Sequence, residues 1–475
     1  MKRLFCLLLL AALCAAAPAS GETRALLIAC SDFVTQPALG SAISGNLHLI
    51  GSALIGAEPP LEGISIEDGT IGSHESLRSA ISDAFSGADE NDLALLYICT
   101  HGILPSADDA KSYLLLSNGK QETAVSADDL YAMLGPVQGE KLLIIDACHS
   151  GAMIGRSAPE TPSLPPPRDE SIHVLTSADA SESSWYYSSD QLSSGAMSYF
   201  ASAFSAGIGL YGRPEADGNG DGSVTLAEMQ QYLNTAVPSS SCQLLSSYAD
   251  GLLLPSAQTA MLSRPLTGFT YGNSLLKTDE AIFEFFFTVS QETIVQYRLV
   301  DYDNGKWDWE NAKTFLDIGD SRSGKLSPGR KHRALTLSDI SAGDSGYLML
   351  QVFSVSKNEL LLCSERLIAV QPAASEAQLQ IEAGPPLATG EIPVLITPGV
   401  PAELTVSVRD SEGRLIRRLC SSQLTRPSAD GMTRLYWDGR DASGTRMSGG
   451  TFTITVDAAI GSVRQKAACS IQLSP

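Results

Sequence analysis

Short unbroken runs of apolar residues alternate with amphipathic segments in the first half of the chain. Four of these runs have the length and composition of strands buried on both faces: Arg24–Cys30, Leu93–Ile98, Leu142–Ile145 and Ile172–Ser177. A shorter strand is expected at Ile64–Glu67. Alternating strands and helices predict an α/β fold, in which helices cover both faces of a doubly wound, mostly parallel sheet.

Helical spacing is clearest between residues 73 and 85. Apolar residues there recur at the i, i+3, i+4 positions of one helix face, and Ser73 is a suitable N-cap. Ser126 and Asp129 have the spacing of a capping box that opens a short helix ending at Leu134. Further helices are expected over Leu39–Ile55, Ser194–Phe204 and Leu226–Leu233.

After residue 265 the helical pattern fades and strand-like segments take over. Ile282–Val289 and Tyr347–Val355 are rich in Phe, Val and Leu. Two segments have the composition of linkers, Ser256–Pro265 and Gln371–Glu376. We therefore expect an α/β domain at residues 22–256, followed by two all-β, immunoglobulin-like sandwich domains at 266–372 and 376–475.

The first residues have the pattern of a secretory signal peptide. Lys2 and Arg3 precede the apolar run Leu4–Ala17, and small residues follow at 17–19. An uncleaved anchor is the alternative, although the apolar run is short for a membrane span. We assign residues 1–21 to a signal peptide and expect an exported protein, periplasmic, on the cell surface or extracellular, with no membrane span after its removal.

Composition narrows the function classes. The chain is 44% hydrophobic and 18% charged, as in globular proteins, and its net charge is −21. This charge argues against nucleic acid and anionic membranes as partners. Seven cysteines lie beyond residue 21, so at least one stays unpaired, and Cys148 is the natural candidate. Cys420 and Cys469 could pair with each other.

Two of the buried runs end in reactive residues. Leu93–Ile98 leads to His101 and Gly102, and Leu142–Ile145 leads to Asp146 and Cys148. The carboxyl ends of parallel neighbouring strands share one sheet edge, so we expect His101 to face Cys148. An imidazole has a suitable pKa to activate a thiol. The backbone N–H groups of Gly102 and Cys148 would then form an oxyanion hole.

Each residue also has a structural interpretation. Cys148 alone could be an inert thiol at a strand end, and His101 alone a hydrogen-bonded strand terminus. Their joint placement, with glycine directly after the histidine, favours catalysis. His149 is a competing base, but it is adjacent to Cys148 in the sequence, so its side chain should point elsewhere.

The two motifs, a hydrophobic block followed by His-Gly and a second followed by Asp-Ala-Cys-His-Ser-Gly, resemble the caspase-like cysteine peptidases (peptidase C14). The metacaspase-type branch is the most similar, and the resemblance covers roughly residues 24–254. It implies a protein or peptide substrate, a thioester intermediate on Cys148 and no organic cofactor. The segment after the first strand would border the substrate cleft.

The resemblance also implies the specificity. It places Asp146 in the pocket for the residue before the cut bond, and Asp32 as a possible second carboxylate there. Carboxylates pair with Arg or Lys, so we expect cleavage after these residues. An orienting or helix-capping acid is the alternative role for Asp146. The alternative function is that of a catalytically inactive caspase-like scaffold that binds or adheres.

A proline-rich loop follows the Cys148 motif and carries Arg156 and Arg168. With basic specificity, this loop is a candidate site of autoprocessing.

An EF-hand-like loop spans residues 217–228. Oxygen-bearing residues occupy alternate positions, Gly222 stands at the sixth, and a glutamate closes the loop. We predict a structural calcium ion held by Asp217, Asn219, Asp221, Ser223, Thr225 and Glu228. The alternative is an acidic turn without metal.

The last domain carries a second family pattern. Trp437-Asp438-Gly439-Arg440-Asp441, then Gly444, then Gly449-Gly450-Thr451-Phe452 resembles the immunoglobulin-like domain of flagellar hook-capping proteins. Asp-Gly and Gly-Gly pairs suit tight turns between strands. We expect Trp437 in the core of this domain. The resemblance indicates a spacer, or a unit for attachment to the cell envelope.

Overall fold

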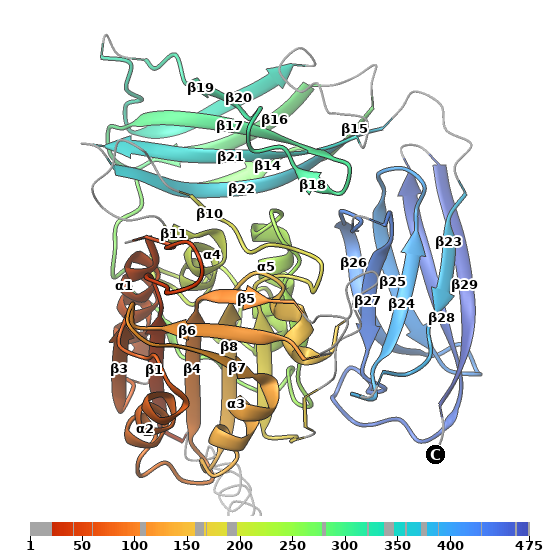
Figure 1. Ribbon diagram of the computed structural model, residues 1–475. Coiled ribbons are helices and arrows are strands. Elements are labelled where there is room, and N and C mark those ends of the chain that lie inside the picture. The colour runs from red at the N-terminus through yellow and green to blue at the C-terminus, as the bar shows by residue number, and fades with distance from the viewer. Residues whose placement is uncertain are drawn as a thin grey trace, which may run out of the picture.

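The structure is a computed structural model. It describes residues 21–473 except 41, 59, 105–110, 157–165, 168, 188–196, 278–281, 321–322, 337–345, 357–358, 372–377, 388, 429 and 461–462. Residues 1–20 of the predicted signal peptide, and Arg168, thus lie outside the described residues. Figure 1 shows an α/β domain with two β domains packed against it.

A six-stranded sheet forms the centre of the α/β domain. Its strand order is β12-β9-β8-β4-β1-β3, and all neighbours are parallel except β12 and β9. The bounds are β1 Thr23–Ala29, β3 Gly63–Asp68, β4 Leu93–Cys99, β8 Glu140–Asp146, β9 Ile172–Thr176 and β12 Gln243–Leu245. The predicted buried strands are β1, β4, β8 and β9. Strand β12 was not predicted, because three residues give no periodicity.

Successive residues of these strands face two different cores. Leu27, Leu95 and Ile144 belong to one hydrophobic cluster, and Leu26, Leu96 and Leu143 to another. The first cluster includes residues of α1 (Ala42–Ile55), α4 (Tyr199–Gly207) and α5 (Leu226–Ala236). The second includes residues of α2 (His74–Ala84) and α3 (Ala127–Leu134). Burial on both sides explains why the strands read as continuous apolar runs.

The N-cap residues of α2 and α3 are those that the sequence predicts. The Ser73 side chain accepts a hydrogen bond from the Ser76 N–H and caps α2. Ser126 and Asp129 form the predicted capping box of α3. Helix α4 begins at Tyr199, later than expected, because Ser198 is extended and its side chain accepts from the Ala201 N–H.

Small elements complete the α/β domain. Strand β5 (His101–Ile103) opens a three-stranded sheet with β6 (Tyr113–Ser117) and β7 (Glu122–Ser126). A 3₁₀ turn, η1, covers Ser150–Ile154. Two short pairs are β2 (Ala57–Glu58) with β13 (Ser256–Ala257), and β10 (Tyr186–Tyr187) with β11 (Met197–Ser198).

In its described residues, the middle domain has strands and no helix. One sheet has the order β14-β16-β20 and the other β15-β22-β21-β17-β18, with β19 paired to β17. The bounds are β14 Leu266–Tyr271, β15 Leu275–Lys277, β16 Ile282–Val289, β17 Ile294–Asp303, β18 Lys306–Trp307, β19 Lys313–Leu316, β20 Gly329–Thr336, β21 Tyr347–Ser356 and β22 Glu359–Gln371. Residues of both sheets share one core, in which Phe283, Phe285 and Phe287 are fully buried. The two predicted strands are β16 and β21.

The C-terminal domain also pairs two sheets. Their orders are β23-β24-β27 and β26-β25-β28-β29. The bounds are β23 Gln380–Ala383, β24 Ile392–Thr397, β25 Glu403–Arg409, β26 Leu415–Leu424, β27 Thr433–Trp437, β28 Gly450–Ile460 and β29 Val463–Leu473. Trp437 is fully buried in their shared core, as expected. Cys420 and Cys469, for which a disulfide was considered, are both free thiols.

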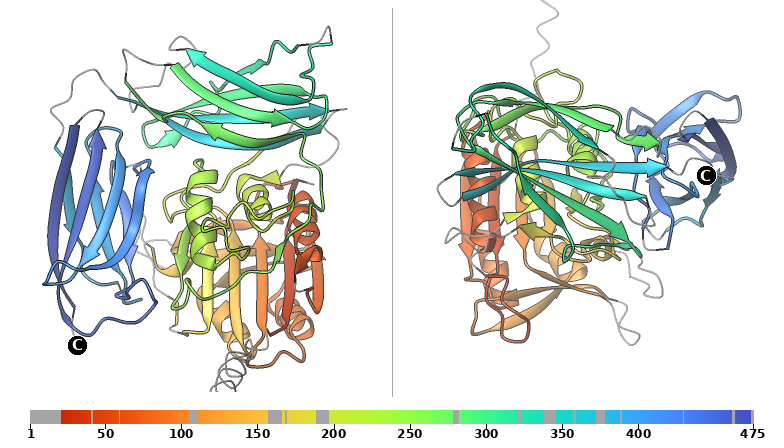
Figure 2. Two further views of the ribbon diagram at one scale, coloured as in Figure 1. Left: turned by 180° about the vertical axis from the view of Figure 1, so that it is seen from behind. Right: turned by 90° about the horizontal axis from the view of Figure 1, so that it is seen from above.

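Both β domains contact the α/β domain (Figures 1 and 2). Phe353, Leu360 and Leu362 of the middle domain belong to the same hydrophobic cluster as α1, α4 and α5. The C-terminal domain is joined by ion pairs such as Arg156–Glu391 and Arg426–Glu182. Among the described residues, we find no helix with the length and hydropathy needed to cross a membrane.

Candidate active site

The two candidate catalytic residues lie just beyond the ends of adjacent strands. Strands β4 and β8 pair in parallel, and Cys99 lies opposite Asp146. The Thr100 N–H donates to the Asp146 carbonyl at 3.3 Å, so the pairing continues past the strand ends. His101 and Cys148 each follow this last pair by two residues. The register therefore brings them to the same edge of the sheet.

Gly102 and Cys148 are in direct backbone contact. A Cβ at position 102 would lie 1.8 Å from the Cys148 carbonyl oxygen and 3.0 Å from its carbonyl carbon. Any side chain would therefore force the two strand ends apart, so the close approach requires glycine. Among the described residues, the backbone hydrogen bonds outside helices and strands include none that the Cys148 N–H donates.

The imidazole of His101 is oriented by the segment that follows β1. Its Nε2 lies 2.9 Å from the carbonyl oxygen of Pro37, and its ring centroid is 4.5 Å from that of Phe33. A carbonyl oxygen only accepts, so Nε2 carries the proton and Nδ1 is the basic nitrogen. The roles of Pro37 and Phe33 had no individual signal in the sequence.

Glu122 holds this segment in place from the opposite side. Its carboxylate accepts hydrogen bonds from the N–H groups of Val34 and Thr35, at 2.7 and 3.2 Å, and from the Thr35 hydroxyl. Burial acts to raise the pKa of Glu122, but these hydrogen bonds and the nearby His101 lower it below its ordinary value. The sequence did not indicate Glu122 as part of the site.

The thiol of Cys148 is largely buried and donates a hydrogen bond to a backbone carbonyl. Its Sγ donates to the carbonyl oxygen of Ser184 at 3.7 Å. Burial raises the pKa of Cys148 above its ordinary value, and the negative charge of Asp146 acts in the same direction. A nucleophilic role for this thiol would therefore require a base that removes its proton.

Asp146 sits in a cage of hydroxyl groups. Its side chain is buried and accepts hydrogen bonds from the hydroxyls of Tyr97 at 2.9 Å, Ser184 at 2.8 Å and Ser198. Burial raises the pKa of Asp146, although the hydroxyls partly offset this effect. The hydroxyls come from three distant segments, which explains why no local sequence pattern indicated them.

Two further predicted residues lie at the periphery. Asp32 is exposed on the segment after β1, where the Ser31 hydroxyl is 3.5 Å from its carboxylate. His149 has a left-handed backbone with φ of 58°. The His149 ring nitrogen Nδ1 lies 3.0 Å from the Ala180 carbonyl oxygen. Burial lowers the pKa of His149. One nitrogen of its ring is thus engaged by a backbone carbonyl.

Comparison with protein-family models identifies the family of the chain. The family model of the caspase domain matches residues 24–266, just over half of the chain. The chain belongs to the caspase-domain family. A second model, the FlgD Ig-like domain, matches residues 387–462. Both matches agree with the two resemblances seen in the sequence.

Solved structures give weaker likenesses. Caspase-1 from Spodoptera frugiperda is 16% identical, with a TM-score of 0.31, over 51% of this chain and 94% of its own. A protein from Geobacter sulfurreducens is 12% identical, with a TM-score of 0.31, over 51% of this chain and 97% of its own. The YadV chaperone is 8% identical, with a TM-score of 0.26, over 44% and 100%. A search of curated proteins finds no match.

The acidic loop of the caspase domain has some features of a calcium loop. Gly222, at the sixth position, has φ of +92°, and Asp217 accepts the N–H groups of Gly220 and Gly222 at 2.7 and 3.1 Å. However, Asp217 also pairs with Arg213, and Glu228 is used in the N-terminal cap of α5. The described residues hold no group of three or more His, Cys, Asp or Glu arranged for a metal ion. Calcium binding therefore stays a prediction.

Arg156 of the caspase domain is not presented for cleavage. Its side chain is 1% exposed and forms hydrogen bonds of 2.5 and 3.0 Å to the carboxylate of Glu391. Its guanidinium also lies 3.6 Å from the centre of the Tyr436 ring. A peptidase would have to remove Arg156 from this interface to cut after it. The placement speaks against the suggested autoprocessing at Arg156.

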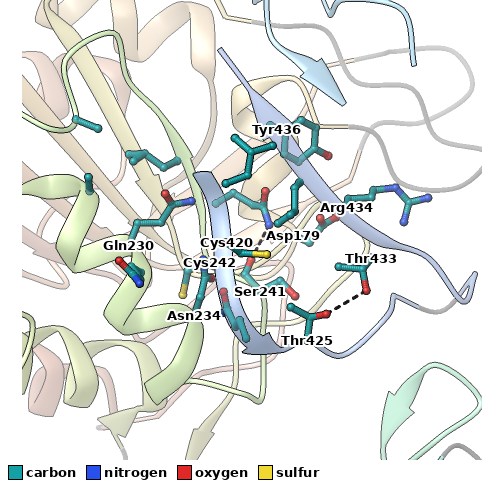
Figure 3. A pocket seen from close by; sticks show the side chains of 18 of the residues that line it. Asp179, Gln230, Asn234, Ser241, Cys242, Cys420, Thr425, Thr433, Arg434 and Tyr436 are labelled. Carbon is teal, nitrogen blue, oxygen red and sulfur yellow. Dashed lines mark hydrogen bonds between the residues drawn. The ribbon is translucent and has the colours of Figure 1, made fainter. Parts of the chain in front are cut away.

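A cavity of about 480 Å³ lies between the caspase domain and the C-terminal domain (Figure 3). Asp179, Ser241 and Cys242 line it from the caspase domain, and Arg434 and Tyr436 from the C-terminal domain. Neither His101 nor Cys148 contributes to the lining. This cavity is therefore distinct from the candidate active site.

Proposed function

We propose that the chain is an exported cysteine endopeptidase that uses His101 and Cys148 and cleaves after Arg or Lys. The observation that carries the proposal is the shared register of β4 and β8, which sets both residues two positions past a common end. The fit of Gly102 against Cys148 and the orientation of His101 by Pro37 support it.

The residues suggest the following chemistry. Nδ1 of His101 takes the thiol proton as Sγ of Cys148 attacks the substrate carbonyl carbon. The N–H groups of Cys148 and Gly102 stabilise the resulting oxyanion. When the peptide C–N bond breaks, His101 returns the proton to the leaving amine, and a thioester remains on Cys148. His101 then deprotonates a water molecule, which hydrolyses the thioester and frees the thiol.

Asp146 supplies the basis for the proposed specificity. Asp146 lies two residues before Cys148. Its carboxylate accepts a hydrogen bond from the Ser184 hydroxyl, and the Ser184 carbonyl accepts one from the Cys148 thiol. Hydroxyl donors favour the ionised carboxylate in a buried place, and an ionised carboxylate pairs well with guanidinium or ammonium groups. Asp32 would add a second negative charge at the outer rim.

A peptide panel tests the proposal. Fluorogenic peptides that differ only in the residue before the cut bond are incubated with reduced wild type, Cys148→Ala and His101→Ala. We expect cleavage of Arg and Lys peptides only by the wild type, and little cleavage after Asp or Ala. Cleavage that survives in Cys148→Ala would exclude the mechanism, and equal cleavage after Asp would exclude the specificity.

Two accessory features belong to the same proposal. The acidic loop would bind calcium for stability, and the C-terminal domain would attach the enzyme to the cell envelope. The N-terminal pattern supports export, and the FlgD Ig-like match is compatible with a surface protein.

A further inference from the structure

All three domains meet at the side chain of Arg426, which lies two residues after the end of strand β26 in the C-terminal domain. Its guanidinium lies 2.6 Å from the carboxylate of Glu182 in the caspase domain. It also donates to the hydroxyl of Tyr302 in the middle domain at 2.8 Å. The guanidinium lies 4.5 Å from the centre of the Tyr302 ring and 5.5 Å from that of Trp307.

Glu182 belongs to a segment that touches the catalytic residues. We call residues 177–187, between β9 and the end of β10, the cleft segment. The Glu182 carbonyl accepts the His149 N–H at 2.8 Å, directly next to the nucleophile. Two residues later, Ser184 accepts from the Cys148 thiol at 3.7 Å and donates to Asp146 at 2.8 Å. A displacement of Glu182 would therefore reach the thiol and the proposed specificity acid.

Arg426 compensates a buried charge. The side chains of Arg426 and Glu182 are only 7% and 12% exposed. Burial acts to raise the pKa of Glu182, but Arg426 and the hydrogen bonds from Ser241 hold it below its ordinary value. The buried Asp179, on the same segment, repels Glu182. Without Arg426, an unpaired carboxylate would remain beside a second acid, which strongly favours rearrangement of the segment.

The middle domain touches the same segment at a second point. The ring centroid of Trp309 lies 5.1 Å from that of Trp185, and 5.8 Å from that of Tyr199. Trp185 directly follows Ser184. By contrast, the cavity between the caspase and C-terminal domains leaves part of the interface behind the segment unfilled. The segment is thus held at a few defined contacts, among which Arg426–Glu182 is an ion pair.

We propose that Arg426 is a positioning residue for the active site, so that the C-terminal domain is a working part of the peptidase. Through Glu182, Arg426 fixes the cleft segment against Cys148 and Asp146. The inference rests on the proposed peptidase function and goes beyond the spacer or attachment role expected for this domain. It predicts that substrate binding depends on a side chain outside the caspase domain.

The test compares Arg426→Met with Arg417→Met in the full-length protein. Arg417 offers a matched control, because it lies in β26 of the same domain and pairs across the same interface with Asp250 at 3.1 Å. For an Arg peptide, we expect Arg426→Met to lower kcat/KM about tenfold or more, mainly through KM, because an unpaired buried charge is left behind. Arg417→Met should stay within about twofold, because its partners Asp250 and Asp438 are 40% and 24% exposed and lie outside the cleft segment. Arg426→Lys should restore much of the loss.

Hydrogen exchange supplies a readout that needs no turnover. Amides of residues 177–187 should exchange faster in Arg426→Met than in the wild type. In Arg417→Met, their exchange rate should equal that of the wild type. The double variant Glu182→Gln/Arg426→Met should exchange more slowly than Arg426→Met, because it leaves no buried charge. If the wild type cleaves no peptide, the peptidase proposal fails, yet exchange still decides the positioning role.

Two results would overturn the inference. One is an unchanged exchange rate over residues 177–187 in a folded Arg426→Met. The other is faster exchange accompanied by equal or higher kcat/KM, which would show that the contact does not support catalysis. Thermal unfolding of each variant checks that the domains remain folded.

Discussion

The backbone of Gly102 lies directly against the carbonyl group of Cys148, so close that a Cβ at residue 102 would lie 1.8 Å from the carbonyl oxygen. This contact joins the two strand ends that carry the candidate base and nucleophile. The positions of the imidazole and the thiol therefore depend on the local packing of two backbones, as well as on their own hydrogen bonds.

Replacing Gly102 with alanine should abolish activity. The added methyl group would displace backbone, and a displacement of about 1 Å in an active site costs about a hundredfold in rate. We expect kcat/KM for an Arg peptide to fall at least that far. Gly63→Ala is the control, because its Cβ would meet nothing within 4 Å. Near wild-type activity in Gly102→Ala would contradict the contact.

Acidic pH should weaken the preference for a charged substrate. Burial raises the pKa of Asp146, so this carboxyl is protonated at a higher pH than an exposed aspartate. Its charge is lost as the pH falls through this raised pKa, so the loss begins at a higher pH than for an exposed aspartate. The ratio of kcat/KM for Arg over citrulline peptides should therefore decrease on acidification. A ratio independent of pH would argue against contact between Asp146 and the substrate.

The hydroxyl cage should control that pH dependence. Ser198→Ala removes a hydroxyl that stabilises the ionised Asp146. Loss of a hydrogen bond to a charged group costs about 1.5–3 kcal/mol, so the pKa of Asp146 should rise further. The acidic limb of the pH profile for Arg peptides should then move to higher pH. An unshifted limb would show that Ser198 does not act through this carboxylate.

Glu122 should influence catalysis through His101. Glu122→Ala removes the acceptor of the Val34 and Thr35 N–H groups, which releases the segment that carries Pro37. We expect kcat to fall about tenfold as the imidazole loses its fixed orientation. Glu75→Ala, an exposed change on α2, serves as the control. Equal kinetics in both variants would show that Glu122 does not contribute to the site.

Intact mass should show no cut after Arg156. The side chain is buried against Glu391 and Tyr436, so the scissile bond cannot enter a second active site without opening the domain interface. Wild type and Cys148→Ala should therefore show no mass difference from cleavage at this bond. A Cys148-dependent cut after Arg156 would mean that the interface opens readily.

Calcium should raise thermal stability if the acidic loop binds it. Binding to the folded state alone increases the free energy of unfolding with ligand concentration. We expect the Tm of the wild type to rise with added calcium and fall with chelator, and Asp217→Asn to lose the response. An identical response in that variant would place calcium elsewhere, and no response in the wild type would exclude the prediction.

The features that could be predicted from the sequence are those determined by residues close together in the chain. Apolar runs identified β1, β4, β8 and β9, because these strands are buried on both faces. Ser73 and Ser126 marked helix starts, because capping acts within three residues. His101 and Cys148 were found because each directly follows such a strand.

Contacts between distant segments were missed. Pro37 orients His101 across 64 residues, and Ser198 reaches Asp146 across 52. Neither residue belongs to a motif, and serine or proline at such positions usually marks a turn. The pairing of Arg426 with Glu182 spans 244 residues and two domains, so no local pattern could reveal it.

Covalent trapping distinguishes a nucleophilic Cys148 from an inert thiol. The reduced full-length protein is treated with a peptidyl ketone inhibitor that carries Arg at the reactive end, and its intact mass is measured. We expect one inhibitor adduct on the wild type, located on Cys148, slower labelling in His101→Ala, and none in Cys148→Ala. An unmodified wild type, or equal labelling of Cys148→Ala, would contradict a nucleophilic role for Cys148.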